Sequence, residues 1–475
     1  MTAAKKILLN AFNMNCVGHI NHGLWTHPRD RSVDYNTLGY WTDLARTLEK
    51  GLFDGLFIAD ILGTYDVYQG NVDVTLRESV QLPVNDPTLL VSAMAAVTRQ
   101  LGFGVTVNQG SEHPYLLARR FSTLDHLTQG RVGWNIVTGY LDSAARALGR
   151  AQQTEHDERY DQADEYLEVL YKLWEGSWED GAVRRDKAAR VFADPQRVHK
   201  VRHQGRYFQL EGYHLSEPSV QRTPVLFQAG TSGRGQRFAA RHAEGIFIGG
   251  ASHEAVRKTV QDLRAQAVLA GRLGDDPKIF MGLTVVVGET EARARELHAE
   301  YLRHASPEAG VAHFSASTGV DYSRFGLDEA IEYGHTNSIQ SAANTARQQG
   351  WTRRRMLEQF ALGGRYPAIV GSPSQVADAL IEWVDRTGID GFNLARTVVP
   401  ESFEDFARLV VPELQSRGRF KTAYEEGSLR HKLHGQGDRL PARHAAQAFR
   451  PAAVAAADPS PVPTPASAPQ AEPVA

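Results

Sequence analysis

A glycine-rich loop between an apolar run and a helical pattern is the sharpest chemical feature of the chain. The segment PVLFQAGTSGRGQRFAARHA, residues 224 to 243, reads as a strand, a loop containing Gly230, Ser232, Gly233 and Gly235, and a helix. Glycines let backbone amides approach a phosphate, and the helix N-terminus and the Ser232 hydroxyl add further donors. The spacing is also compatible with a tight turn that merely requires glycine.

The strand after this loop argues against a dinucleotide. A nicotinamide dinucleotide site would place an acidic residue at the end of that strand to bind the ribose. The next apolar run, GIFIGG at residues 245 to 250, ends in glycines instead. The loop therefore favours the phosphate of a mononucleotide.

A second polar cluster opens another helical pattern, HDERYDQADEY. His156 and Tyr160 lie four residues apart, so an imidazole and a hydroxyl share one helix face and can reach the same phosphate. An exposed capping segment is the alternative interpretation. Asp60, Asn135 and Thr138 stand where two other apolar runs end.

The N-terminal segment NCVGHINHGLWTHP carries Cys16, His19, His22 and His27. Eighteen histidines in the chain make a metal site worth considering, but HExxH and CxxC motifs are missing, and we expect no metal. Cys16 and His19 are also spaced as a nucleophile and its base, although a small buried thiol is the commoner role. No G-x-S-x-G elbow supports hydrolase chemistry.

The elements that must position these residues alternate regularly. Eight apolar runs are separated by helical patterns, which is typical of βα units around a parallel sheet. The runs cover residues 6–13, 53–60, 101–108, 131–139, 224–230, 245–250, 278–288 and 390–395. We predict an α/β fold, a (β/α)8 TIM barrel with insertions after strands 4 and 7, and a doubly wound sheet is the alternative. In a barrel, Asp60, Asn135 and Thr138 face the mouth, where barrel enzymes hold their active sites.

Composition sets the remaining limits. The 475 residues are 42% hydrophobic and 23% charged with a net charge of -3, so neither nucleic acid nor a membrane is an expected partner. A single cysteine and the lack of a signal-peptide core or an apolar stretch of ~20 residues favour the cytoplasm. We expect one barrel domain over residues 1–445 and a disordered tail rich in Pro and Ala over residues 446–475.

Long blocks of the chain resemble a known family. AFNMNCVGHINHGLWTHPRD, EHPYLLARRFSTLDHLTQGRVGWNIVT, EHDERYDQADEYLEVLYKLWEGSWED and QRTPVLFQAGTSGRGQRFAARHAE are similar to the FMN-dependent two-component monooxygenases of the bacterial-luciferase-like superfamily, in their nitrilotriacetate and dibenzothiophene-sulfone branch. The resemblance runs from about residue 6 to about residue 445. It is greatest to the alkane-oxidising members.

The resemblance implies a TIM barrel that takes reduced FMN from a separate NAD(P)H:flavin reductase. The bound reduced FMN would react with O2 to form a C4a-peroxyflavin, which would transfer one oxygen atom to a small, mostly apolar organic substrate. Relatives of this kind are homodimers or homotetramers. A deazaflavin-dependent hydride-transferring oxidoreductase of the same superfamily is the alternative, and an inactive flavin-binding protein is a third reading.

The resemblance also implies site residues. Those implied to contact the flavin are Asp60, Asn108, Asn135, Thr138, His156, Tyr160, Gly230, Thr231 and Ser232. Those implied near the substrate or the reacting oxygen are Cys16, His19, Tyr65, Gln81, Tyr140 and His313. Tyr140 stands where the alkane enzymes have a histidine, and Asn108, Gln109 and Gly110 are smaller than their counterparts there. His19 or His313 would hydrogen-bond the distal peroxide oxygen or assist its protonation.

Overall fold

Eight parallel strands close into a barrel in the computed structural model, which describes residues 5–230, 232–331, 338–339, 346, 350–364 and 366–451. The ring closes because β13 pairs with both β1 and β11. Its strands, in spatial order, are β1 (Leu8–Met14), β2 (Gly55–Ala59), β3 (Gly102–Asn108), β4 (Val132–Val137), β9 (Val225–Gln228), β10 (Gly245–Ile248), β11 (Lys278–Val287) and β13 (Gly391–Ala395). Each lies within its expected run except β1, which extends one residue further, and the predicted TIM barrel is confirmed.

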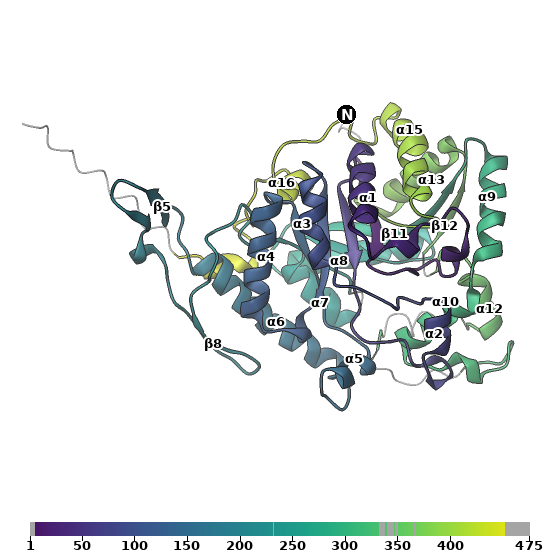
Figure 1. Cartoon of the computed structure of the whole chain (residues 1–475), viewed down its shortest axis with the longest axis horizontal. Helices are drawn as coiled ribbons and strands as arrows, with labels where there is room; N and C mark the ends of the chain where they lie inside the picture. The colour runs from purple at the N-terminus through teal and green to yellow at the C-terminus, as the bar shows by residue number, and fades with distance from the viewer. Residues whose placement is uncertain are drawn as a thin grey trace, which may run out of the picture.

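Helices cover the outside of this ring, and α1, α3 and α4 lie side by side, with α1 against β2 and α4 against β4 (Figure 1). The covering helices are α1 (Leu38–Lys50), α3 (Thr88–Ala96), α4 (Pro114–Thr128), α6 (His156–Tyr171), α7 (Gly233–His242), α8 (His253–Leu269), α13 (Pro373–Thr387), α14 (Glu401–Asp405) and α15 (Val411–Ser416). Among the residues described, no helix is both long and apolar enough to cross a membrane.

Helix α1 shows how the local sequence sets an element. The Thr37 side chain accepts a hydrogen bond from the Tyr40 amide and so caps the first turn, and the helix ends at Gly51. Trp41, Leu44, Ala45 and Leu48, at helical spacing, are all buried, as the periodicity predicted.

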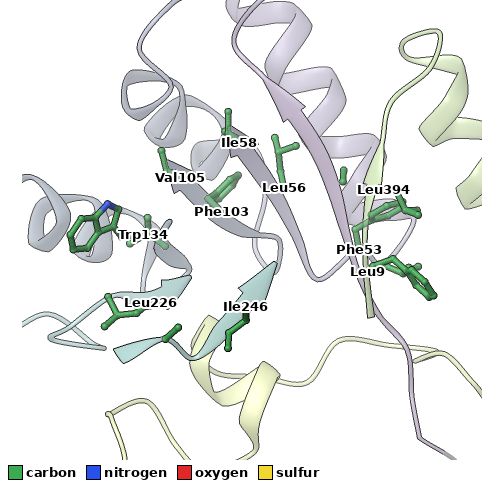
Figure 2. Close-up of a cluster of buried hydrophobic side chains, with 14 of the residues drawn as sticks. Leu9, Phe53, Leu56, Ile58, Phe103, Val105, Trp134, Leu226, Ile246 and Leu394 are labelled. Atoms are coloured by element: carbon green, nitrogen blue, oxygen red, sulfur yellow. The ribbon is translucent and has the colours of Figure 1, made fainter. Parts of the chain in front are cut away.

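The core has two layers, one between strands and helices and one inside the barrel. Alternate strand residues point outward against the helices, among them the labelled side chains of Figure 2 such as Leu9, Leu56, Phe103 and Leu394. The inward positions form a separate cluster dominated by aromatic rings: Phe12, Phe57, Phe227, Phe247 and Phe280. The middle of the barrel is therefore filled, and a ligand must bind above it, at the carboxyl ends of the strands.

Small residues make room for these rings. A Cβ atom on Gly133 would lie 2.6 Å from Phe227, and one on Gly245 would lie 2.4 Å from the same ring. Helix α16 (Leu429–His434) closes the other end of the barrel by adding Leu429 and Leu433 to the inner cluster.

The two insertions lie where the sequence placed them. After β4, helix α5 (Asp142–Ala147) precedes α6, and two hairpins follow that project from the body as an arm (Figure 1). They are β5 (Val183–Asp186) with β6 (Val191–Ala193), and β7 (Val201–Gln204) with β8 (Gln209–Gly212). The second of these hairpins contains the segment HQGRYFQLEG, residues 203–212.

The insertion after β11 contains α9 (Glu291–His304), α10 (Pro307–Thr318), α12 (Arg353–Gln359) and β12 (Ala368–Gly371), which pairs with β11. The Ser-rich stretch FSASTG, residues 314–319, lies in this insertion. This stretch ends helix α10, whose residues from Ala309 to Thr318 are all buried. Its small side chains allow close packing, because Gly310 lies against Phe360 with no room for a Cβ atom.

The chain remains packed beyond the expected end of the domain. Residues Ala445–Phe449 form a 3-10 turn, Ala446 is fully buried, and Arg450 pairs with buried Glu175 at 2.6 Å. Residues 452–475 lie outside the described part, so the disordered tail stays a prediction.

Candidate active site

The polar residues predicted for the mouth lie at the carboxyl ends of consecutive barrel strands. Asp60 directly follows β2, Asn108 ends β3, Thr138 directly follows β4, and Gly230 lies two residues after the end of β9. Because all eight strands are parallel, these ends meet at the same rim. Thr231 lies outside the described residues.

The first cluster at the rim joins the N-termini of two helices. His156 opens α6, and Ser232 is the N-cap of α7. Nε2 of His156 lies 3.3 Å from Oγ of Ser232, and that oxygen accepts a hydrogen bond from the Gly235 amide at 3.1 Å. A helix N-terminus with an imidazole and a hydroxyl beside it is suited to an anion such as a phosphate.

Tyr160 completes this phosphate corner, as we call the site formed by His156, Tyr160, Ser232 and the first turn of α7. The Gln228 amide donates to the Tyr160 hydroxyl at 3.4 Å, and burial raises the pKa of that phenol. Cβ atoms on Gly230 and Gly235 would lie 2.7 and 2.8 Å from the same hydroxyl. The lack of side chains at Gly230 and Gly235 therefore leaves room for the Tyr160 hydroxyl. These glycines do more than allow the chain to turn.

Asn135 offers an acceptor at the centre of the mouth. Its neighbour Trp134 packs outward against α6, so Asn135 points into the barrel, and it is paired in register with Phe227 of β9. Its Nδ2 donates to Thr106 at 2.8 Å, whereas its buried Oδ1 has no hydrogen-bond partner in the described part of the chain. A buried acceptor without a partner is costly, so it fits a ligand N–H or an ordered water.

Asp60 is a titratable group at the mouth whose pKa is shifted. Burial raises the pKa of its carboxyl to about 7; the Ile61 backbone N–H lowers this pKa, and the Asp86 carboxylate raises it. The carboxyl therefore changes charge near neutral pH. Asn108, by contrast, uses its Oδ1 locally to accept from the Gly110 amide at 2.8 Å.

A second cluster brings together four predicted residues from distant parts of the sequence. The Tyr140 hydroxyl donates to the Tyr65 hydroxyl at 3.4 Å, and Tyr65 donates to Oε1 of Gln81 at 2.6 Å. The Tyr65 ring stacks on the His313 imidazole, with ring centroids 4.9 Å apart and an angle of 16°. Around Tyr65 and Tyr140 lie apolar side chains, including Val80, Leu141 and Ala316.

A small pocket, partly open to solvent, lies beside this cluster. Its walls come from the loop after β1, from α10 and from the segment before β12. The lining residues are Ile20, His22, Gly310, His313, Phe314, Ser317, Phe360 and Gly364. This histidine pocket is mostly apolar and carries two imidazoles.

Cys16 and His19 lie on the loop after β1, which pairs with residues 80–84 through bridges at Cys16 and Gly18. The Cys16 thiol donates to the Gly18 carbonyl at 3.1 Å, and burial raises its pKa to about 12. A thiol that stays protonated at neutral pH is a poor nucleophile, which disfavours the Cys16–His19 pair. The His19 ring packs edge-on against Phe12, with centroids 4.6 Å apart.

Three further residues reach the mouth that sequence reasoning did not select. Gln228 ends β9 and Arg396 follows β13, so the strand-end rule that selected Asp60 would have found both. His22 is the second histidine of His19-x-x-His22 and was weighed only as a metal ligand. Among the described residues no group of three or more His, Cys, Asp or Glu side chains could hold a metal ion, and His27 pairs with Glu300 at 3.0 Å.

Comparison with known proteins decides the class to which this site belongs. The model of a family described as luciferase-like monooxygenase matches residues 19–391. The chain belongs to this family. Its prediction as a monooxygenase is thereby confirmed.

Individual relatives of this family match almost the whole chain. A dimethyl-sulfide monooxygenase from Hyphomicrobium sulfonivorans is 51% identical over 95% of each chain. A long-chain alkane monooxygenase from Geobacillus thermodenitrificans is 50% identical over 94% of this chain and 98% of its own. A crystal structure of a riboflavin lyase with modified FMN and riboflavin superposes with a TM-score of 0.90, at 36% identity, covering 94% of this chain and all of that one.

Proposed function

We propose that the protein is a monooxygenase that binds reduced FMN from a separate NAD(P)H:flavin reductase and transfers one atom of O2 to a small, mostly apolar organic substrate. The observation that carries this proposal is the presence of two different clusters at one barrel mouth. The phosphate corner suits the anionic end of a mononucleotide, and the histidine pocket suits an apolar reactant. Membership of the luciferase-like family supports a flavin as the cofactor.

The residues present fit FMN on their donor chemistry. The first turn of α7, the Ser232 hydroxyl, His156 and Tyr160 would hold the phosphate. The free acceptor of Asn135 and the carboxyl of Asp60 suit a ring system whose edge presents both N–H and C=O groups. The riboflavin lyase of the same fold was solved with a modified FMN, which supports this assignment.

The reduced flavin, when bound, supplies the chemistry that activates oxygen. The chain's own residues exclude water and place the substrate. Filled aromatic packing lies beneath the mouth, and buried α10 walls one side of the pocket. His313 and His19 are candidates to hydrogen-bond a reacting oxygen atom, and the Tyr65 ring fixes the plane of His313.

The relatives suggest the substrate class. Relatives at 39–51% identity are named for a sulfide, a long-chain alkane and a sulfone, all without ionised groups, whereas one at 32% identity is named for nitrilotriacetate, a polyanion. The apolar walls around Tyr65 and Tyr140 fit the compounds without ionised groups. We therefore propose a hydrocarbon or organosulfur substrate. A homodimer or homotetramer is proposed from the family alone.

Oxygen uptake tests the proposal and its alternative together. The protein would be given photoreduced FMN or a reduced deazaflavin, each with dimethyl sulfide, hexadecane or dibenzothiophene sulfone, and analysed by mass spectrometry. The proposal expects, for at least one compound, product formation that requires the protein, FMN and O2 and adds one oxygen atom to the substrate, counted over both fragments where a C–S bond is cleaved; reduced FMN without protein corrects for its own oxygen uptake. Hydride transfer with the deazaflavin alone would favour the deazaflavin oxidoreductase, and binding of FMN without turnover would favour an inactive flavin protein.

A further inference from the structure

His22 and His313 form a buried imidazole pair in the wall of the histidine pocket. Nε2 of His22 lies 3.1 Å from Nδ1 of His313, and the two rings meet edge-on with centroids 5.3 Å apart. His22 is 1% exposed and His313 is 8% exposed. A hydrogen bond between two neutral imidazoles couples their tautomers, because the nitrogen that donates carries a proton and the nitrogen that accepts does not.

The backbone around His22 is tied to the helix that carries His313. The His22 carbonyl accepts from the amide of Ser306, the N-cap residue of α10, at 2.9 Å. The side chain of Asn21 donates to the Arg396 carbonyl at 2.7 Å and accepts from the Gly363 amide at 2.6 Å. The loop after β1 and α10 therefore hold the two imidazoles in a fixed relation.

The surroundings decide which way this hydrogen bond points. Burial lowers the pKa of His22 to about 3, and the Arg396 guanidinium lowers it too, so His22 is neutral and carries one proton. Its Nδ1 has no hydrogen-bond partner in the described part of the chain. Orphaned buried N–H groups are rarer than orphaned acceptors, so the proton belongs on Nε2, where it is donated to His313.

We propose that His22 is a positioning residue, which through its Nε2–Nδ1 hydrogen bond holds neutral His313 with its proton on Nε2. His313 then acts as a hydrogen-bond donor to the reactant in the pocket that both residues line. The stacked Tyr65 ring holds the plane of the imidazole. This inference rests on the proposed function of His313, and nothing in the resemblance or the comparisons assigns a role to His22.

The direct test is the tautomer of His313 in the protein without flavin. Two-dimensional ¹⁵N NMR of histidine-labelled protein, with the His313 signal identified by its loss in His313→Ala, reports which nitrogen is protonated. Protonated Nε2 and unprotonated Nδ1 are expected in the wild type, with a mixture of tautomers in His22→Leu. A wild-type His313 protonated on Nδ1 would overturn the proposal.

Two replacements of His22 provide the functional test. Gln offers an N–H near the position of Nε2, whereas Leu has similar bulk and no donor. We expect His22→Gln to keep product formation within a few-fold and His22→Leu to lose 10- to 100-fold in kcat, with FMN affinity and Tm alike in the two variants. Equal activity of Gln and Leu would contradict the positioning role.

The same change in a His313→Ala background separates this inference from the proposed function. If His22 acts through His313, His22→Leu causes less than a twofold further loss there. A full additional loss would overturn the inference. Full activity of His313→Ala itself would reject the proposed donor role of His313 and the positioning role that depends on it, whereas oxygen uptake would still test the monooxygenase.

Discussion

Nε2 of His156 and Oγ of Ser232 lie 3.3 Å apart, although one residue opens α6 and the other caps α7. Two helix N-termini thus converge on one point of the rim. This convergence suits the glycine-rich turn to an anion, and under the proposed function it makes the FMN phosphate the part whose recognition is easiest to isolate.

Ser232→Ala and His156→Ala should each weaken FMN binding roughly tenfold or more, because each loses a hydrogen bond to a charged group. Riboflavin, which lacks the phosphate, should lose little affinity. Fluorescence titration with both ligands makes the comparison. Ser252→Ala is the matched control, since Ser252 caps α8 in the same way. An equal loss for FMN and riboflavin would contradict the phosphate corner.

Asp60→Asn should change the pH dependence of stability. The folded-state pKa of Asp60 is raised to about 7, so ionisation is penalised in the folded protein and stability falls as pH rises from about 4 through 7. The Asn variant escapes this penalty. Urea unfolding without flavin should find it more stable than wild type at pH 8.5, by at most about 4 kcal/mol, and closer to wild type at pH 4.5. A gain in the free energy of unfolding that is the same at both pH values would argue against a raised pKa of Asp60.

Tyr65→Phe and Tyr65→Leu should separate the hydroxyl from the ring. Phe keeps the stack on His313 but cannot donate to Gln81, which should cost about 1 kcal/mol of stability and only part of the activity. Leu also removes the stack, and product formation should fall much further. The measurements are urea unfolding and the ratio of product to hydrogen peroxide. Similar ratios in the two variants would show that the stack is dispensable.

Gly245→Ala should destabilise the barrel by about 1–3 kcal/mol, because the added Cβ atom would lie 2.4 Å from the Phe227 ring. Combining it with Phe227→Leu should cost less than the two changes added together. Gly39 is the control: it lies in α1 with no atom near its added Cβ, so Ala there should stabilise by up to about 1 kcal/mol. Strict additivity at residues 245 and 227 would contradict the clash.

The fold could be predicted because buried parallel strands are continuous apolar runs, and such runs can be recognised in the sequence without knowledge of tertiary contacts. His156 and Tyr160 were predicted to act together for a similar reason. Residues four positions apart on a helix lie on the same face, and in the structure the ring centroids of these two residues are 5.3 Å apart. The placement of Asp60 and Asn135 at the mouth could be predicted from the direction of the strands alone.

The rest depends on contacts that no local pattern records. Tyr65 and His313 meet because the insertion after β11 folds back over the mouth, and only the resemblance pointed to either residue. FSASTG reads as an irregular stretch because small polar residues have weak helix propensity, and tertiary packing of α10 overrides that propensity. His22 was missed because its role depends on the residue that it touches.

The most direct test of the central claim is the origin of the oxygen atom in the product. The protein, a flavin reductase, NADH and FMN would turn over an accepted substrate under ¹⁸O2 in ordinary water, and mass spectrometry would read the product. The account predicts one ¹⁸O atom per product molecule, and none when the label is in the water. A product without label from ¹⁸O2, or a product formed equally well without oxygen, would contradict it.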